Sequence, residues 1–343
     1  MAQPRLTFFC ELEADRLQEL FSDEAVVEGL RAVQGSVSLG ILDLSPERAA
    51  VVRLLNQHRI PVIAWQLLPK EQGYWFNVDN APQAAARYQA FKEWTAEHGL
   101  RWDGVGLDIE PDIREMRQLA VDRRSLLPVL LKRGLDTERL RRAQMQYQIL
   151  VAQIRADGYR VDSYQMPLIV DERQAGSTLL QRLAGLVDIA VDREVLMLYS
   201  SLMPYGAALL WSYAPDAQSV GVGVTGGGVE IEGVSSSPPL DWDEFSRDLL
   251  LAHRWTDDIH IFSLEGCVQQ GFLSRLPDFD WEAPIVPPVE SAAQVQHLRQ
   301  ALRAALWASA HPWLVTMGLL SILWMLRGGK RGKRKAESVK RKT

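Results

Sequence analysis

Residues 104–111 read GVGLDIEP, a short apolar run that ends in two carboxylates and a proline. Its apolar side chains occupy the odd positions, while Asp108 and Glu110 occupy even ones, so the two acids share one face of an expected strand. The opposite, apolar face is suited to packing against helices. The pattern predicts a buried strand of an α/β fold with two acids at its carboxyl end.

Seven more short apolar runs alternate with stretches of helical period along residues 1–283. Strands that alternate with helices predict right-handed βαβ units and a parallel sheet. Eight such units in one chain of this length favour a closed (β/α)8 TIM barrel, which typically takes about 250 residues. A doubly wound sheet is the alternative, although no GxGxxG motif follows the first run. The expected strands are 6–12, 37–44, 60–68, 104–109, 160–170, 195–200, 219–225 and 259–264.

The carboxyl ends of barrel strands form the active face of TIM-barrel enzymes. Acids that are buried there without a partner are costly, so several of them at strand ends point to chemistry. Flat aromatic rings beside them suit the CH faces of sugars. From the strand ends and the loop that follows strand 60–68, we expect substrate-binding residues at Glu11, Trp65, Gln66, Trp75, Gln165 and Glu265.

Asp108 and Glu110 are the strongest catalytic candidates. Two carboxylates two residues apart on one strand lie about 6–7 Å from each other and repel as anions, which favours a proton on one of them near neutral pH. A carboxyl group with a raised pKa can protonate the leaving oxygen of a glycosidic bond. The spacing therefore predicts acid/base chemistry.

The stretch Asp103-Gly-Val-Gly-Leu-Asp108-Ile-Glu110 resembles the strand-4 signature DGxDxDxE of the chitinase-like glycoside hydrolases of family 18, with Gly106 in place of one acid. Met197-Leu-Tyr199-Ser200 is similar to the MxYD motif of that family, with Ser200 in place of the final aspartate.

This resemblance implies a substrate-assisted retaining mechanism on an N-acetylhexosamine-containing glycan. Glu110 would be the general acid/base, Asp108 would orient the acetamido group of the substrate, and Tyr199 would hydrogen-bond its oxygen. Gly106 removes a supporting carboxylate, and Ser200 removes a partner for the substrate. The two departures leave open a catalytically inactive glycan-binding barrel.

A metal-dependent phosphodiesterase-type hydrolase is a further alternative, in which Glu11, Asp43, Asp108 and Glu110 would hold Mg²⁺ or Ca²⁺. The histidines usually found beside such metals do not accompany these acids in the sequence. We therefore expect no metal and no cofactor, and a glycan as the ligand. The net charge of −5 gives no sign of a nucleic-acid partner.

That net charge hides an asymmetry. Residues 327–343 hold nine lysine and arginine residues and one glutamate, a net charge of +8, so the preceding 326 residues carry −13. We expect a barrel domain over 1–283, a Pro-rich linker and helix over 284–303, a transmembrane helix over 304–326 and a basic tail over 327–343. The 23 residues of 304–326 lack a full charge and are long enough to cross a bilayer.

These features predict a single-pass C-terminal anchor in the membrane, with membrane lipid as a partner of the helix and tail. The side of the membrane on which the barrel lies stays open. The basic tail favours a cytoplasmic tail and an exported barrel. The N-terminal sequence, however, contains no apolar run long enough for a signal peptide, which favours a cytoplasmic barrel.

Overall fold

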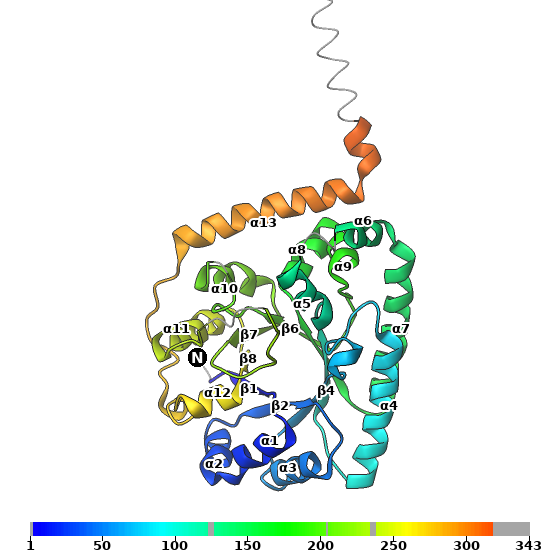
Figure 1. Cartoon of the computed structure of the whole chain (residues 1–343). Helices are drawn as coiled ribbons and strands as arrows, with labels where there is room; N and C mark the ends of the chain where they lie inside the picture. Colours follow the sequence, from blue (N-terminus) through cyan, green and yellow to red (C-terminus); the bar gives the residue numbers. More distant parts are fainter. Residues whose placement is uncertain (1–2, 123–126, 204, 234–237, 318–343) are drawn as a thin grey trace, which may run out of the picture.

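The computed structural model of the chain describes residues 3–122, 127–203, 205–233 and 238–317. Eight parallel strands, each paired with its two neighbours in chain order, close into a barrel surrounded by helices (Figure 1). This is the (β/α)8 architecture that the alternating pattern predicts. The strands are β1 (Arg5–Cys10), β2 (Ser36–Ile41), β3 (Val62–Gln66), β4 (Gly104–Ile109), β5 (Arg160–Gln165), β6 (Arg193–Met197), β7 (Ser219–Gly223) and β8 (Asp258–Phe262).

The helical segments that the structure describes are α1 (Ala14–Ser22), α2 (Glu24–Ala32), α3 (Pro46–Gln57), α4 (Ala81–His98), α5 (Ile113–Val121), α6 (Leu127–Leu135), α7 (Thr137–Ala156), α8 (Leu168–Ala175), α9 (Leu179–Ala184), α10 (Ala207–Tyr213), α11 (Trp242–His253), α12 (Leu264–Gln269) and α13 (Val289–Ala310), with short 3₁₀ turns η1 (Lys70–Gln72), η2 (Ala214–Asp216) and η3 (Leu276–Asp278). Polar caps begin several of them. Asp241 forms a capping box with Glu244 at α11, and the Ser45 hydroxyl accepts from the Arg48 N–H at α3.

The main hydrophobic core lies between the strands and the helices. Side chains that alternate along each strand enter this layer, for example Val105, Leu107 and Ile109 of β4, all fully buried. The intervening side chains point into the barrel, where Phe9, Trp65 and Tyr164 pack edge to face. This two-sided burial explains why the strands read as near-continuous apolar runs.

Every expected strand is present, with shifts of a few residues at the ends. The largest difference concerns the expected strand 160–170, because β5 ends at Gln165 and α8 begins at Leu168. Pro167 lies between them and cannot donate a ladder hydrogen bond, so it ends the strand. The connection after β4 holds α5, α6 and α7 among the described residues.

Helix α13 packs on the barrel rather than standing apart from it. It lies along α8 and α10 (Figure 1). The Arg299 side chain is 4% exposed and its Nε lies 3.0 Å from Asp171, which is itself fully buried. The same guanidinium contacts Asp216 at 2.7 Å and lies over the Tyr213 ring at 3.8 Å from its centroid. The helix expected within 284–303 is thus an outer helix of the barrel.

The expected transmembrane helix begins inside α13. Residues 304–310 complete α13, His311 interrupts it before Pro312, and 312–317 are helical again. Residues 318–326 and the basic tail 327–343 lie outside the described residues. Within the part of the chain that the structure describes, we find no helix with the length and apolar character to cross a membrane. The anchor therefore stays a prediction.

Candidate active site

The carboxyl end of the barrel gathers the acids that the sequence singles out. Asp108 is the next-to-last residue of strand β4 and is 2% exposed. Its Oδ2 accepts a hydrogen bond of 3.0 Å from the Trp65 indole N–H of the neighbouring strand. Its Oδ1 has no hydrogen-bond partner among the described residues and is buried. The Trp65 indole therefore orients one of the two carboxylate oxygens.

Asp108 and Glu110 titrate as a pair. Burial, then the charge of Glu110, raises the pKa of Asp108 well above its usual range. Burial also raises the pKa of Glu110 to about 7, although a side-chain hydrogen bond with Asp108 partly opposes that rise. The raised pKa values of the two carboxyl groups favour at least one proton on the pair near neutral pH.

Tyr199 follows β6 and reaches the same place. Burial, then the charges of Asp108 and Glu110, raises the pKa of its phenol well above the usual range. The phenol therefore stays protonated and can donate a hydrogen bond at neutral pH. Its ring packs against Phe262, with 5.6 Å between the ring centroids. The structure thus brings Asp108, Glu110 and Tyr199 together.

Glu11 and Glu265 form a second acidic pair beside the first. The backbone N–H of Glu11 donates to Glu265 Oε1 at 3.4 Å, and the Tyr74 hydroxyl donates to Glu11 Oε1. Burial, and to a smaller extent the charges of Glu265 and Glu110, raises the pKa of Glu11 to about 8. Burial raises the pKa of Glu265 to about 7. All four carboxyl groups at this carboxyl end of the barrel, which we call the mouth, therefore have raised pKa values.

Tyr74 contacts the acids but is absent from the candidates that we selected from the sequence. It lies in the loop after β3, which is tied to β4 by two backbone hydrogen bonds. The Phe76 N–H donates to Asp108 O at 2.8 Å, and the Glu110 N–H donates to Phe76 O at 3.2 Å. This pairing carries Tyr74 to the mouth. The three consecutive aromatic residues at 74–76 could have indicated that this loop packs on the barrel, because aromatic side chains in a loop are normally buried.

Trp75 lies beside Tyr74, with 5.4 Å between the ring centroids, and is 6% exposed. Gln66 and Gln165 lie elsewhere. Each follows an inward-facing aromatic side chain, Trp65 or Tyr164, by one residue, so each points to the opposite, outer face of its strand. Gln165 there donates to Val187 O at 3.4 Å. The structure does not bring these two glutamines to the acids.

The two departures from the family motifs have structural counterparts. A Cβ atom on Gly106 would lie 2.3 Å from the Tyr164 hydroxyl oxygen, so the Tyr164 ring fills the space of the absent acid. The Tyr164 hydroxyl shares a hydrogen bond of 2.6 Å with Ser38 across the barrel. Ser200 is buried and donates to Asp248 of α11, so its hydroxyl points away from the mouth.

The metal alternative needs a set of converging ligands. Over the described ranges, no group of three or more histidine, cysteine, aspartate or glutamate side chains is arranged to hold a metal ion. Asp43, one of the expected ligands, instead pairs with the buried Arg48 at 2.8 Å. Burial opposes the drop, but the hydrogen bonds from Arg48 and Ser45 lower the pKa of Asp43 to about 2. Asp43 is therefore committed to an ion pair.

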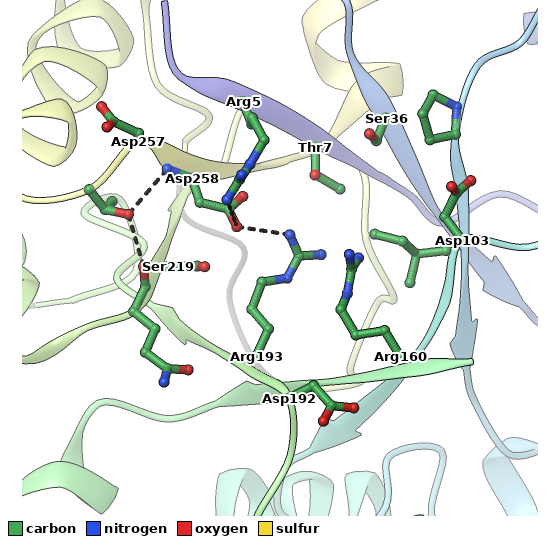
Figure 2. A pocket seen from close by; sticks show the side chains of 14 residues that line it. Arg5, Thr7, Ser36, Asp103, Arg160, Asp192, Arg193, Ser219, Asp257 and Asp258 are labelled. Carbon is green, nitrogen blue, oxygen red and sulfur yellow. Dashed lines mark hydrogen bonds and ion pairs between the residues drawn. The ribbon is translucent and has the colours of Figure 1, made fainter. Parts of the chain in front are cut away.

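A cavity of about 710 Å³ opens at the amino-terminal end of the barrel, opposite the four acids. Figure 2 shows the guanidinium groups of Arg5, Arg160 and Arg193 gathered in it with Asp258. Arg193 contacts Asp258 at 2.8 Å and also bonds Asp162, which is fully buried. Arg5 and Arg160 contact Asp258 and Asp162 at 3.2 and 3.0 Å, so ion pairs join the strands at this end of the barrel.

No protein-family model matches the chain, and no curated protein matches it. Solved structures with a similar fold include the glycoside hydrolase domain of PgaB (BpsB) from Bordetella bronchiseptica, at 9% identity and a TM-score of 0.49 over 81% of this chain and 99% of that one. A xylose isomerase-like TIM-barrel protein from Mycobacterium smegmatis matches at 11% identity and a TM-score of 0.42, over 81% and 98%. A mutant tryptophan synthase α-subunit from Pyrococcus furiosus matches at 14% and 0.42, over 81% and 98%. These sequence identities and TM-scores are too low to support any inference about the chemistry of this protein.

Proposed function

We propose that the chain is a glycoside hydrolase that cleaves an N-acetylhexosamine-containing glycan by acid/base catalysis at the carboxyl end of its barrel. The observation that carries the proposal is the Asp108–Glu110 pair. Burial raises the pKa values of both carboxyl groups, and the Trp65 indole N–H orients one carboxylate oxygen of Asp108. A buried carboxyl group that keeps its proton at neutral pH is the group that a departing sugar oxygen needs.

The proposed mechanism gives each group one task. Glu110 passes its proton to the glycosidic oxygen as the bond from the anomeric carbon breaks. The acetamido oxygen of the substrate attacks that carbon, and a cyclic intermediate forms. Asp108 accepts from the acetamido N–H, and Tyr199 donates to the acetamido oxygen. Glu110, now ionised, takes a proton from the water that opens the intermediate, and the anomeric configuration is retained.

The environment of Asp108 supports this division. The Trp65 indole N–H fixes one carboxylate oxygen at 3.0 Å, so the other keeps a defined direction. The proton shared with Glu110 can move to the outer carboxyl when a substrate approaches. Glu110 is less buried than Asp108, which suits a group that must meet both the leaving oxygen and water.

The test compares Glu110→Gln with the wild type on chitooligosaccharides and on a fluorogenic N,N′-diacetylchitobioside. We expect turnover to fall by about a hundredfold to ten-thousandfold while the thermal midpoint changes little. Glu13→Gln is the matched control, because it removes the same charge from an exposed residue near Tyr74. Its turnover should equal that of the wild type.

Other outcomes would replace the proposal. A wild-type protein that cleaves nothing across a broad glycan panel but binds one member would be a glycan-binding barrel. Activity that a chelator abolishes and that added Mg²⁺ or Ca²⁺ restores would instead favour the metal-dependent hydrolase.

A further inference from the structure

The glycine-rich segment 225–233, between β7 and α11, lies directly on the carboxyl groups of the mouth. A Cβ atom on Gly227 would stand 2.4 Å from Glu265 Oε1. One on Gly228 would stand 3.7 Å from Glu11 Oε2. Val229 and Ile231 pack against the aromatic cluster of the mouth, which includes Trp65 and Tyr74. This close approach covers the side of the mouth where Glu11 and Glu265 lie.

The start of the segment is fixed firmly to β8. The Thr225 N–H donates to Phe262 O at 2.8 Å, and the Thr225 hydroxyl donates to Ser263 O at 2.9 Å. The Ser263 hydroxyl donates to Gly226 O at 2.6 Å. All three bonds lie at residues 225–226, so any movement of the segment must pivot beyond Gly226.

Beyond that pivot, the segment is held by contacts of two different kinds. Glu232 forms an ion pair with Arg117 of α5, but their side chains are 73% and 61% exposed. Exposed pairs of this kind stabilise by about 1 kcal/mol or less. The carboxyl group of Glu11, which is 9% exposed and accepts from Tyr74, instead lies directly against the backbone at Gly228, where a Cβ atom would stand 3.7 Å from its Oε2, and beside Val229. Together with the apolar packing of Val229 and Ile231, this buried contact holds the segment more firmly than the exposed ion pair does.

We propose that Glu11 is a positioning residue: its carboxyl group, oriented by Tyr74, contacts the segment 225–233 at Gly228 and Val229 and latches it over the mouth. The segment releases this contact and pivots at Gly227 when a glycan enters, and it closes again over the bound sugar. The latch belongs to the free protein, and only its role in turnover rests on the proposed function.

Hydrogen–deuterium exchange of the full chain tests the latch without any substrate. Glu11→Ala and Tyr74→Phe should speed exchange in peptides covering 227–233 by about tenfold, while exchange in β1 to β8 stays slow. Glu11→Gln keeps the size of the side chain and one acceptor oxygen for the Tyr74 hydroxyl, and should restore near wild-type exchange. Glu13→Ala, an exposed neighbour, should change nothing.

A second pair of variants tests the pivot by steric means. Gly227→Ala places a methyl group against Glu265 and should lift the segment, which would speed exchange over 228–233. Gly271→Ala is its matched control, because Gly271 has a similar φ of +70° but no atom within 4 Å of the new Cβ. The backbone strain is then the same, and the collision is absent.

The outcomes separate the two proposals. Unchanged exchange at 227–233 in Tyr74→Phe and Gly227→Ala would overturn the latch, even if Glu11→Ala fails to fold. If exchange responds as expected but no chitooligosaccharide is cleaved by the wild type, the latch stands and the hydrolase proposal fails. If chitotetraose is cleaved, Glu11→Ala should lower kcat/KM and Glu11→Gln should recover most of it. A loss in Glu11→Ala that Glu11→Gln fails to recover would show that Glu11 acts by its charge and would overturn the positioning role.

Discussion

The Tyr164 ring occupies the space into which a side chain on Gly106 would project, because a Cβ atom there would lie 2.3 Å from the Tyr164 hydroxyl oxygen. Tyr164 is 1% exposed and packs against Phe9 and Trp65. The position of the Tyr164 ring therefore requires a glycine at position 106. The carboxylate that family 18 carries at this place has no room in this barrel.

Restoring that acid should harm the protein. We expect Gly106→Asp to lower the free energy of unfolding by about 3 kcal/mol or more, through overpacking and a buried charge without a partner. Urea unfolding measures the loss. The double variant with Tyr164→Ala should recover part of it. A stable Gly106→Asp protein with raised glycosidase activity would contradict this view of the packing.

The stability of the protein should depend on Glu11 and on pH. The pKa of Glu11 is raised from 4.5 to about 8, so its protonated form stabilises the fold at low pH. That contribution is lost as the pH rises from the unfolded pKa through the folded one. Glu11→Gln should therefore be more stable than the wild type at about pH 8, by about 2 to 4 kcal/mol beyond the difference at about pH 5. Parallel denaturation curves at both pH values give the comparison, and a pH-independent difference would contradict it.

The barrel could be predicted from the sequence because alternation and run length are local signals. The pairing of Asp108 with Glu110 is also local, since both lie on one strand. Gln66 and Gln165 show where a strand-end inventory fails. We selected the last residues of each expected strand as one group, although the side chains of successive residues point to opposite faces of the sheet. Trp65 reaches the mouth for the same reason that Gln66 does not.

Tyr74 and the segment 225–233 could not be placed from the sequence. Their positions depend on contacts between loops that follow different strands, such as the bond from Tyr74 to Glu11. The ion pairs at the base of the barrel pose the same problem. Arg193 and Asp258 are far apart in the chain, and the strand register that joins them is not a local property.

Arg193 should be essential for stability. It contacts both Asp162, which is fully buried, and Asp258, which is 6% exposed. Removing a cation from buried carboxylates costs about 3 to 5 kcal/mol, so Arg193→Met should lose that much in urea unfolding. Arg155→Met is the control, because its pair with Asp192 is 43% and 35% exposed and should be worth about 1 kcal/mol or less. Equal losses in the two variants would contradict the assignment.

Arg299 should fasten α13 to the barrel. Arg299→Met leaves Asp171 buried with a weaker partner, so α13 should detach and become sensitive to protease while the barrel stays folded. Limited proteolysis followed by mass spectrometry locates the cuts. Arg303→Met is the comparison, since Arg303 is 32% exposed and lies 3.7 Å from Asp171. Protection of α13 in both variants would show that apolar packing holds the helix.

The docking of α13 also bears on how the barrel can be produced on its own. A recombinant fragment that ends at residue 283, where the prolines begin, would lack Arg299 and would expose the surfaces of α8 and α10 that α13 covers. Such a fragment would carry Asp171 without its closest cation and would tend to aggregate through the uncovered helices. A fragment that ends after Ala310 keeps both, so the useful boundary for expression and crystallisation follows the last helix rather than the proline-rich stretch.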